Sequence, residues 1–239
     1  MRTWKEDNLL RESRKTVVKS RRSLETLIKN RVKKYGPTCD LNDIDVSKIT
    51  DMSYLFYGID FNGDISQWDV SNVKNMERMF VKSKFNGDIS QWDVSSVENM
   101  KEMFLLSKFN NDISEWDVSN VKDMSGMFQM SKFNGDISDW DVSSVENMGS
   151  MFFNSKFNRN ISNWDVSNVK NMRMMFACSF FDKDISQWDV SNVEDMSYMF
   201  EDSYFNRNLS NWNVSDGTDV YSMFFGSSLQ RKEPSWYRN

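Results

Sequence analysis

Apolar residues recur along this chain with a period of 24 residues. The first full unit runs from Phe61 to Lys84, and later units begin at Phe85, Phe109, Phe133, Phe157, Phe181 and Phe205. With the leading phenylalanine counted as position 1, apolar residues fall at positions 1, 5, 8, 10, 13, 16, 19 and 20. A fixed period of this length is typical of solenoids and other repeat architectures, in which each unit buries its apolar side against its neighbours.

Two shorter periodicities predict the secondary structure inside each unit. Apolar and polar residues alternate at positions 7 to 11, which favours a short half-buried strand, Gln67–Ser71 in the first unit. Positions 13, 16, 19 and 20 then follow helical spacing, and position 15 is always Asn or Asp, a preferred N-cap. We therefore expect a helix of one to two turns from Met76 to about Ser83, repeated in every unit.

These elements predict an α/β fold. The expected architecture is a right-handed, leucine-rich-repeat-like solenoid with one short parallel strand and one short helix per 24-residue coil. The spacing Ile65-x-x-Trp68-x-Val70 matches the leucine-rich repeat pattern. Each buried indole N–H needs an acceptor, and we expect a backbone carbonyl of the neighbouring coil to supply it.

The repeat divides the chain into three parts. Residues 1–36 are expected to form a basic helical arm and cap, and residues 37–228 the solenoid, with a partial unit at 37–60 and seven full units at 61–228. Residues 229–239 are expected to form a carboxy-terminal half-unit, because Leu229 and Trp236 lie 24 residues beyond Phe205 and Trp212.

One face of a helix is recognisable near the amino terminus. Its apolar residues are Leu24, Leu27, Ile28, Val32 and Tyr35. Their spacing predicts a helix over 24–35 that covers the first coil and ends at Gly36-Pro37. A repeat array needs such a cap, because its terminal unit otherwise exposes apolar surface.

Charge is unevenly distributed. The chain carries −5 in total, with +8 in residues 1–35 and +2 in residues 229–239, so the body between them carries −15. There is no histidine, which excludes imidazole as a base or a metal ligand. Cys39 and Cys178 are about six coils apart and are therefore expected to be free thiols.

A column of carboxylates is the first candidate binding site. Here a column means the residues at one position of successive units. Position 9 reads Asp69, Asp93, Asp117, Asp141, Asp165 and Asp189, and then Asn213. Three interpretations stay open: the carboxylates accept hydrogen bonds from nearby backbone and serine groups, they bind a basic partner, or they bind calcium.

The amino-terminal basic segment is the second candidate site. Its cationic residues are Arg11, Arg14, Lys15, Lys19, Arg21 and Arg22. The segment is either a solvated helix face or a contact arm for an acidic partner, a nucleic acid or a lipid surface. Nucleic acid is disfavoured, because Trp4 is the one aromatic residue that accompanies the charge. We expect residues 1–23 to be dispensable for folding.

Two further columns carry charge. Position 14 alternates in sign, and its members are Lys74, Glu98, Lys122, Glu146, Lys170 and Glu194. Lysine beside glutamate in adjacent coils favours one register of the stack. Position 24 instead repeats one sign, with Lys84, Lys108, Lys132 and Lys156, before Phe180 and Tyr204 replace the lysine.

The repeated motif resembles a known family. Phe-Asn-x-Asp-Ile-Ser-x-Trp-Asp-Val-Ser-x-Val-x-x-Met-x-x-Met-Phe is similar to the BspA-like leucine-rich repeat of bacterial and mycoplasma surface lipoproteins, over residues 38–228. The resemblance implies a solenoid used in binding or adhesion, and it supplies no catalytic residues. The signal peptide, lipobox and wall anchor of the surface proteins are not recognisable in this sequence.

The sequence favours a non-enzymatic protein-interaction or adhesion scaffold. We expect no catalytic, cofactor or metal site, because the carboxylates recur evenly instead of converging on one place. The alternative is a structural component of a viral particle or cell envelope, anchored by the basic segment. No transmembrane segment is recognisable, and we expect the chain to act in the cytoplasm or within an assembly.

Overall fold

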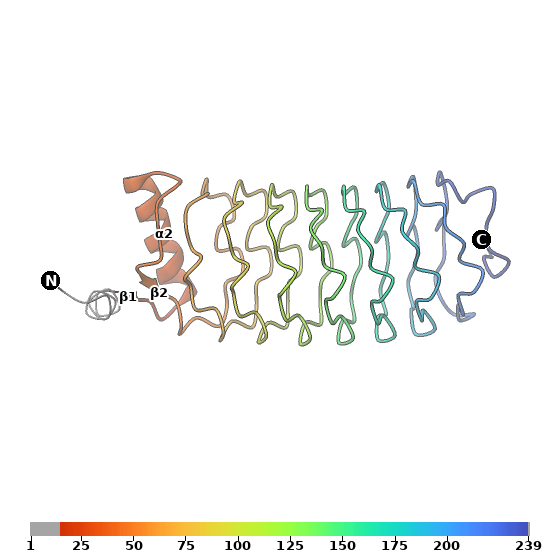
Figure 1. The fold of residues 1–239 in the computed structure, drawn as a ribbon, viewed down its shortest axis with the longest axis horizontal. Helices are drawn as coiled ribbons and strands as arrows, with labels where there is room; N and C mark the ends of the chain where they lie inside the picture. Colours follow the sequence, from red (N-terminus) through yellow and green to blue (C-terminus); the bar gives the residue numbers. More distant parts are fainter. Residues whose placement is uncertain (1–14, 239) are drawn as a thin grey trace.

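The computed structural model describes residues 15–238, which form one elongated stack of coils (Figure 1). Its regular elements all lie at the amino-terminal end: strand β1 (Thr16–Val17), helix α2 (Arg21–Tyr35) and strand β2 (Ile44–Asp45). Helix α2 covers one end of the stack, and the chain ends at the other. The repeat solenoid expected from the 24-residue period is confirmed.

Helix α2 is the predicted cap, and it begins three residues earlier than expected. The hydroxyl of Ser20 accepts the Ser23 backbone N–H and caps the amino-terminal end, and Gly36, at φ 92°, ends the helix. Leu24 and Ile28 are fully buried, and Leu27 and Val32 pack against the same core. The predicted apolar face is therefore confirmed for these four residues.

Tyr35 was expected on that face and is instead 57% exposed. It lies in the last turn of α2, where the cationic groups of Arg31 and Lys34 lie over its ring. Cation–π contact at the surface therefore holds this ring outside the core.

The segment before α2 belongs to the folded body. Strand β1 pairs in parallel with β2, with Thr16 opposite Ile44 and Val17 opposite Asp45. Val18 is buried in the core. Residues 16–20 therefore supply a strand, a core side chain and the cap of α2, which argues against the expectation that residues 1–23 are dispensable for folding.

Each coil is built from a repeated corner made of an Asx residue and a turn. In the first unit the corner at positions 4 to 8 is Asp64-Ile65-Ser66-Gln67-Trp68. The Asp64 carboxylate accepts the Ser66 N–H at 2.9 Å, and the Trp68 N–H donates to the Ile65 carbonyl at 3.2 Å. The turn places both apolar side chains inside the coil, and the aspartate stays outside.

The same corner recurs twice more in the unit. At positions 9 to 13, Asp69 accepts the Ser71 N–H, and the Val73 N–H donates to the Val70 carbonyl. At positions 15 to 19, Asn75 accepts the Glu77 N–H. Asp and Asn favour such turns, because their short side chains reach the backbone two residues ahead.

The strand expected over Gln67–Ser71 is wrong, and so is the strand in every later unit. Trp68 ends one corner, and Val70 is the first apolar residue of the next corner, which begins at Asp69. The alternation of apolar and polar residues therefore comes from two successive turns and not from a strand. Adjacent coils form isolated parallel bridges at position 15, from Asp51 to Asp219, in place of a sheet of strands.

The helix expected from Met76 to Ser83 is also wrong. Asn75 caps the segment as predicted, but the N–H groups of Met76, Arg78 and Phe80 donate to carbonyls of the next coil at 2.9 Å. Arg78 has φ 54°, in the left-handed region that a right-handed helix excludes. Bonding between coils therefore replaces the helix.

Positions 18 and 22 adopt positive φ in every coil from Tyr54 to Gly226. Glycine occupies only Gly58, Gly126 and Gly226 among these sites, and the others carry side chains. A side chain in this region costs free energy, which the hydrogen bonds between coils offset.

The coils lie closer together at one edge than at the other. Rings one coil apart are separated by 5.1 Å for Phe180 and Tyr204 at position 24, and by 5.3 to 5.9 Å in the phenylalanine column at position 20. The separation is 6.0 to 6.4 Å in the phenylalanine column at position 1, and 6.4 Å for Trp68 and Trp92 at position 8. The stack therefore fans out toward the tryptophan edge, the lower edge of Figure 1.

Side chains bridge the coils at the wide edge. The indole N–H of Trp68 donates to the Leu41 carbonyl at 3.0 Å. Every later tryptophan repeats this bond to a residue 27 positions earlier, ending with Trp236 and Leu209 at 2.7 Å. The predicted carbonyl acceptor is therefore confirmed, and the Trp236 bond and the buried Leu229 continue the pattern into the last residues of the chain.

Replacing Gly126 by alanine should lower the free energy of unfolding by about 1 kcal/mol, because φ is +61° there and a side chain strains that backbone. Urea unfolding of wild type and variant measures the change. Gly217→Ala is the control, since a Cβ at Gly217 meets no atom within 4 Å and φ is not positive. Equal losses in the two variants would contradict the role of the left-handed site.

Candidate binding surface

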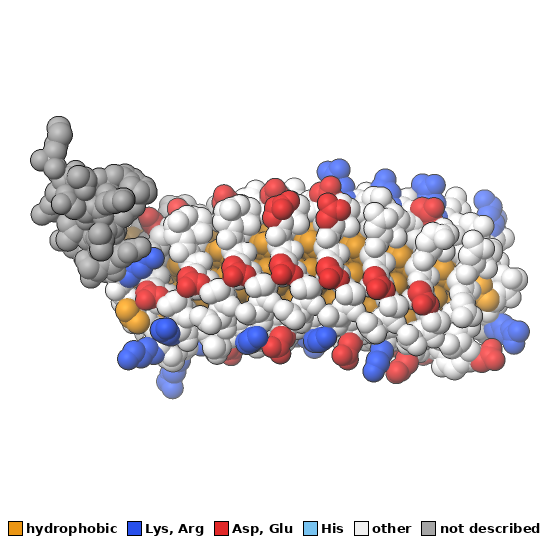
Figure 2. All heavy atoms as spheres, turned by 60° about the horizontal axis from the view of Figure 1, so that its bottom comes forward, with side chains coloured by type: hydrophobic (Ala, Val, Ile, Leu, Met, Phe, Trp, Pro, Cys, Tyr) orange, Lys and Arg blue, Asp and Glu red, His pale blue; other side chains and the backbone are white. Residues whose placement is uncertain are grey.

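The six aspartates of position 9 form an exposed column along the wide edge of the solenoid. Figure 2 shows a line of acidic side chains running along the long axis on this side. The residues are Asp69, Asp93, Asp117, Asp141, Asp165 and Asp189. The sequence prediction of an outward-facing acidic column is therefore confirmed.

Each of these carboxylates also supports its own corner. One oxygen of Asp117 accepts the Ser119 N–H at 3.1 Å and the Ser119 hydroxyl at 2.6 Å. The hydroxyl first, and then the backbone N–H, lower the pKa of Asp117, and Ser191 lowers the pKa of Asp189 in the same order. Since these bonds use Oδ1, the second oxygen remains available for a partner.

A second acidic column lies at position 4, and it was not among the sites predicted from the sequence. Its members are Asp64, Asp88, Asp112, Asp136, Asn160, Asp184 and Asn208. The backbone N–H two residues ahead lowers the pKa of Asp112, Asp136 and Asp184. The sequence could have predicted this column, because Asp-Ile-Ser, which begins at position 4, has the same pattern as Asp-Val-Ser, which begins at position 9.

The tryptophan edges lie between the two acidic columns. Tryptophans at position 8 are 3–4% exposed, and Figure 2 shows an apolar strip bordered by acidic side chains. We call the position 4 column, the tryptophan strip and the position 9 column together the acidic face. This surface offers a narrow apolar line between two rows of negative charge.

The structure separates the basic residues of the amino-terminal segment. Lys15, Lys19 and Arg22 are exposed. Arg21 is partly buried and donates to the Ser53 carbonyl of the first coil at 2.6 Å, so it helps to hold the cap. Arg11 and Arg14 lie outside the described residues.

The alternating column at position 14 stacks as predicted. The Glu98 N–H donates to the Lys74 carbonyl, and the Lys122 N–H to the Glu98 carbonyl. The side chains of Lys74 and Glu98 form an ion pair at 3.2 Å. Both are more than half exposed, so the pair contributes little beyond setting the register of neighbouring coils.

Within residues 15–238, no group of three or more acidic or cysteine side chains is arranged to hold a metal ion. Both cysteines are free thiols, as expected, and burial raises the pKa of each. In the same part of the chain, no helix is long and apolar enough to span a bilayer.

Comparison with known families identifies the repeat. Residues 26–132 and 129–236 each match the family described as Mycoplasma protein of unknown function, DUF285. The chain belongs to this family. The two DUF285 matches begin inside α2 and reach Trp236, so they cover the whole solenoid. Neither the search of curated proteins nor the search of solved structures found a match.

Acid should destabilise the solenoid. Six corner aspartates have pKa values lowered from the ordinary value of about 4, so their hydrogen bonds stabilise the fold fully above about pH 4. They are Asp64, Asp112, Asp117, Asp136, Asp184 and Asp189. This contribution is lost as the pH falls further, through the lower folded-state pKa values. Thermal unfolding followed from pH 6 to about pH 2.5 measures the loss. A midpoint that does not fall in acid would contradict this role.

Proposed function

We propose that this chain is a non-enzymatic interaction scaffold whose acidic face binds a basic segment of another protein. The observation that carries the proposal is the column of aspartates at position 9, which keeps one oxygen of each carboxylate free of the corner hydrogen bonds. The resemblance to adhesive BspA-like repeats supports a binding role.

The charge distribution supports the same assignment. The solenoid body carries −15, and the two aspartate columns concentrate part of that charge on one edge. A surface of one sign attracts an oppositely charged partner and speeds its association. The absence of histidine and the even spacing of carboxylates favour binding over catalysis.

The partner's basic groups would meet one carboxylate per coil. A lysine- or arginine-rich segment that lies along the axis can pair with successive aspartates, and its aliphatic parts can cover the tryptophan strip. Since exposed ion pairs are individually weak, affinity depends on several coils acting together.

Replacing Asp93, Asp117 and Asp141 by asparagine should weaken binding of an oligolysine peptide roughly tenfold, because three exposed ion pairs are lost. Asparagine keeps the Oδ1 acceptor, as Asn160 and Asn208 do at the position 4 corner, so thermal unfolding should change little. Isothermal titration calorimetry at low salt measures the affinity.

The matched control replaces Glu98, Glu146 and Glu194 by glutamine. It removes the same charge from the alternating column and should weaken binding by less than about twofold. Equal weakening by the two variants would reject the acidic face as the site. Severe unfolding of the asparagine variant would assign the aspartates to structure alone.

The second candidate function is a structural component of a larger assembly, anchored by the basic amino-terminal segment. The exposed cations Lys15, Lys19 and Arg22 at the capped end favour it. Residues 16–20 contact the folded body, so charge reversal tests this role better than truncation does.

Changing Lys15, Lys19 and Arg22 to glutamate should abolish co-purification with a large particle from the native source if the segment anchors the chain there. The control changes Lys29, Lys33 and Lys34 of α2 to glutamate and should retain co-purification. Sedimentation of the extract separates particle-bound from free chain. An identical distribution of wild type and the first variant would reject anchoring by this segment.

A further inference from the structure

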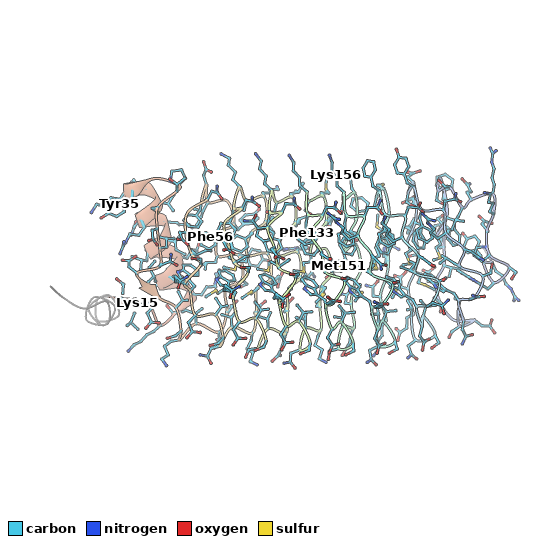
Figure 3. All side chains as sticks on the ribbon, in the orientation of Figure 1. Lys15, Tyr35, Phe56, Phe133, Met151 and Lys156 are labelled. Carbon is cyan, nitrogen blue, oxygen red and sulfur yellow. The ribbon has the colours of Figure 1, made fainter. Side chains whose placement is uncertain are left out.

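The narrow edge of the solenoid carries a lysine column with unusual surroundings. Lys84, Lys108, Lys132 and Lys156 occupy position 24 of successive coils and are all exposed. Lys84 pairs with Asp60 at 3.1 Å. Among the described residues, the other three lysines form no ion pair. Figure 3 shows Lys156 projecting from the upper edge of the stack.

The spacing of this column makes its charges repel one another. Phe180 and Tyr204 continue position 24, and their ring centroids lie 5.1 Å apart, so side chains of successive coils lie close together in this column. Like charges this close on neighbouring chain segments are destabilising.

Other charged columns in the same molecule are compensated. Position 14 alternates lysine with glutamate, and the position 9 aspartates accept hydrogen bonds from serine. The lysine column has neither arrangement. A bound anion would neutralise the repulsion between the lysines of this column.

The short segments that carry the lysines contain no acidic residue, and Asp88, Asp112 and Asp136 of the position 4 column follow directly after three of them. Residues 82–87, 106–111, 130–135 and 154–159 form this edge in four successive coils, and none of them is Asp or Glu. Their remaining cations are Lys82 and Arg159. On a body of strongly negative charge, this edge is a local positive strip.

A row of amide groups lies two residues after the lysines. The side-chain oxygens of Asn86, Asn110 and Asn134 each accept the backbone N–H of the next asparagine in the column, at 2.7 to 2.9 Å. This contact determines the orientation of each amide and leaves its NH₂ group as a donor. In the described residues these NH₂ groups have no hydrogen-bond partner.

We propose that Lys108, Lys132 and Lys156, with the neighbouring asparagine amides, form a binding site for a linear acidic polysaccharide with one carboxylate per sugar unit. The ammonium groups pair with carboxylates, and the amide NH₂ groups donate to hydroxyl and ring oxygens. One sugar unit per coil matches the spacing, because an extended hexose unit is about as long as the step between coils.

Single-stranded nucleic acid fits this edge less well. Such ligands are normally bound by aromatic rings on which bases stack. Phe180 and Tyr204 stack on each other, at an interplanar angle of 9°, so one face of each ring is already covered. The aromatic residues of the four edge segments are the buried phenylalanines of position 1.

The test measures binding of polygalacturonate to the full chain at low salt by calorimetry. Changing Lys108, Lys132 and Lys156 to serine should weaken binding about tenfold or more and flatten its salt dependence, because three neutralised charges are lost. Changing Lys74, Lys122 and Lys170 of the alternating column to serine removes the same charge and should weaken binding by less than about twofold.

Two further ligands complete the experiment. Fully methyl-esterified polygalacturonate keeps the sugar backbone without the charge, and it should not bind. Single-stranded poly-dT should bind more weakly than polygalacturonate. Absence of polygalacturonate binding by the wild type, equal weakening in the two lysine variants, or tighter binding of poly-dT would each overturn the proposal.

Discussion

Side-chain oxygens that capture backbone N–H groups at the corners hold each coil in shape. Asp64, Asp69 and Asn75 each accept the N–H two residues ahead, and a turn follows that places two apolar side chains inside. Without these acceptors the corner N–H groups of a chain with almost no strand or helix would lack partners. The aromatic stacks and the bonds between coils depend on corners held in this way.

The same geometry determines where charge can lie. Position 9 must present a carboxylate or amide to its corner, so an acidic column is partly a by-product of folding. The side chain at position 24 is not needed for a corner hydrogen bond, because the hydroxyl of the preceding residue, Ser83 in the first unit, accepts the Phe85 N–H. Lysines repeated there therefore point to a ligand more directly than the aspartates do, although both columns are equally regular in the sequence.

The sequence could predict features that follow from the repeat period and from which side chains are apolar or polar. The 24-residue period, the buried face of α2, the carbonyl acceptor of each indole and the half-unit ending at Trp236 were all predicted. The acidic column at position 9 was also predicted, but its partner at position 4 was missed. The strand and the helix of each coil were wrong, because an Asx residue followed by apolar residues three apart fits a capped helix and an isolated turn equally well.

Only the tertiary structure decided between those two conformations. The N–H groups of Met76, Arg78 and Phe80 can bond within a helix or to the next coil, and the presence of that coil favours the second arrangement. The sequence by itself determined the period, the core and the order of charges along each column. The fanned stacking determined how far apart those charges lie, because spacing depends on whether backbone or side chains bridge neighbouring coils.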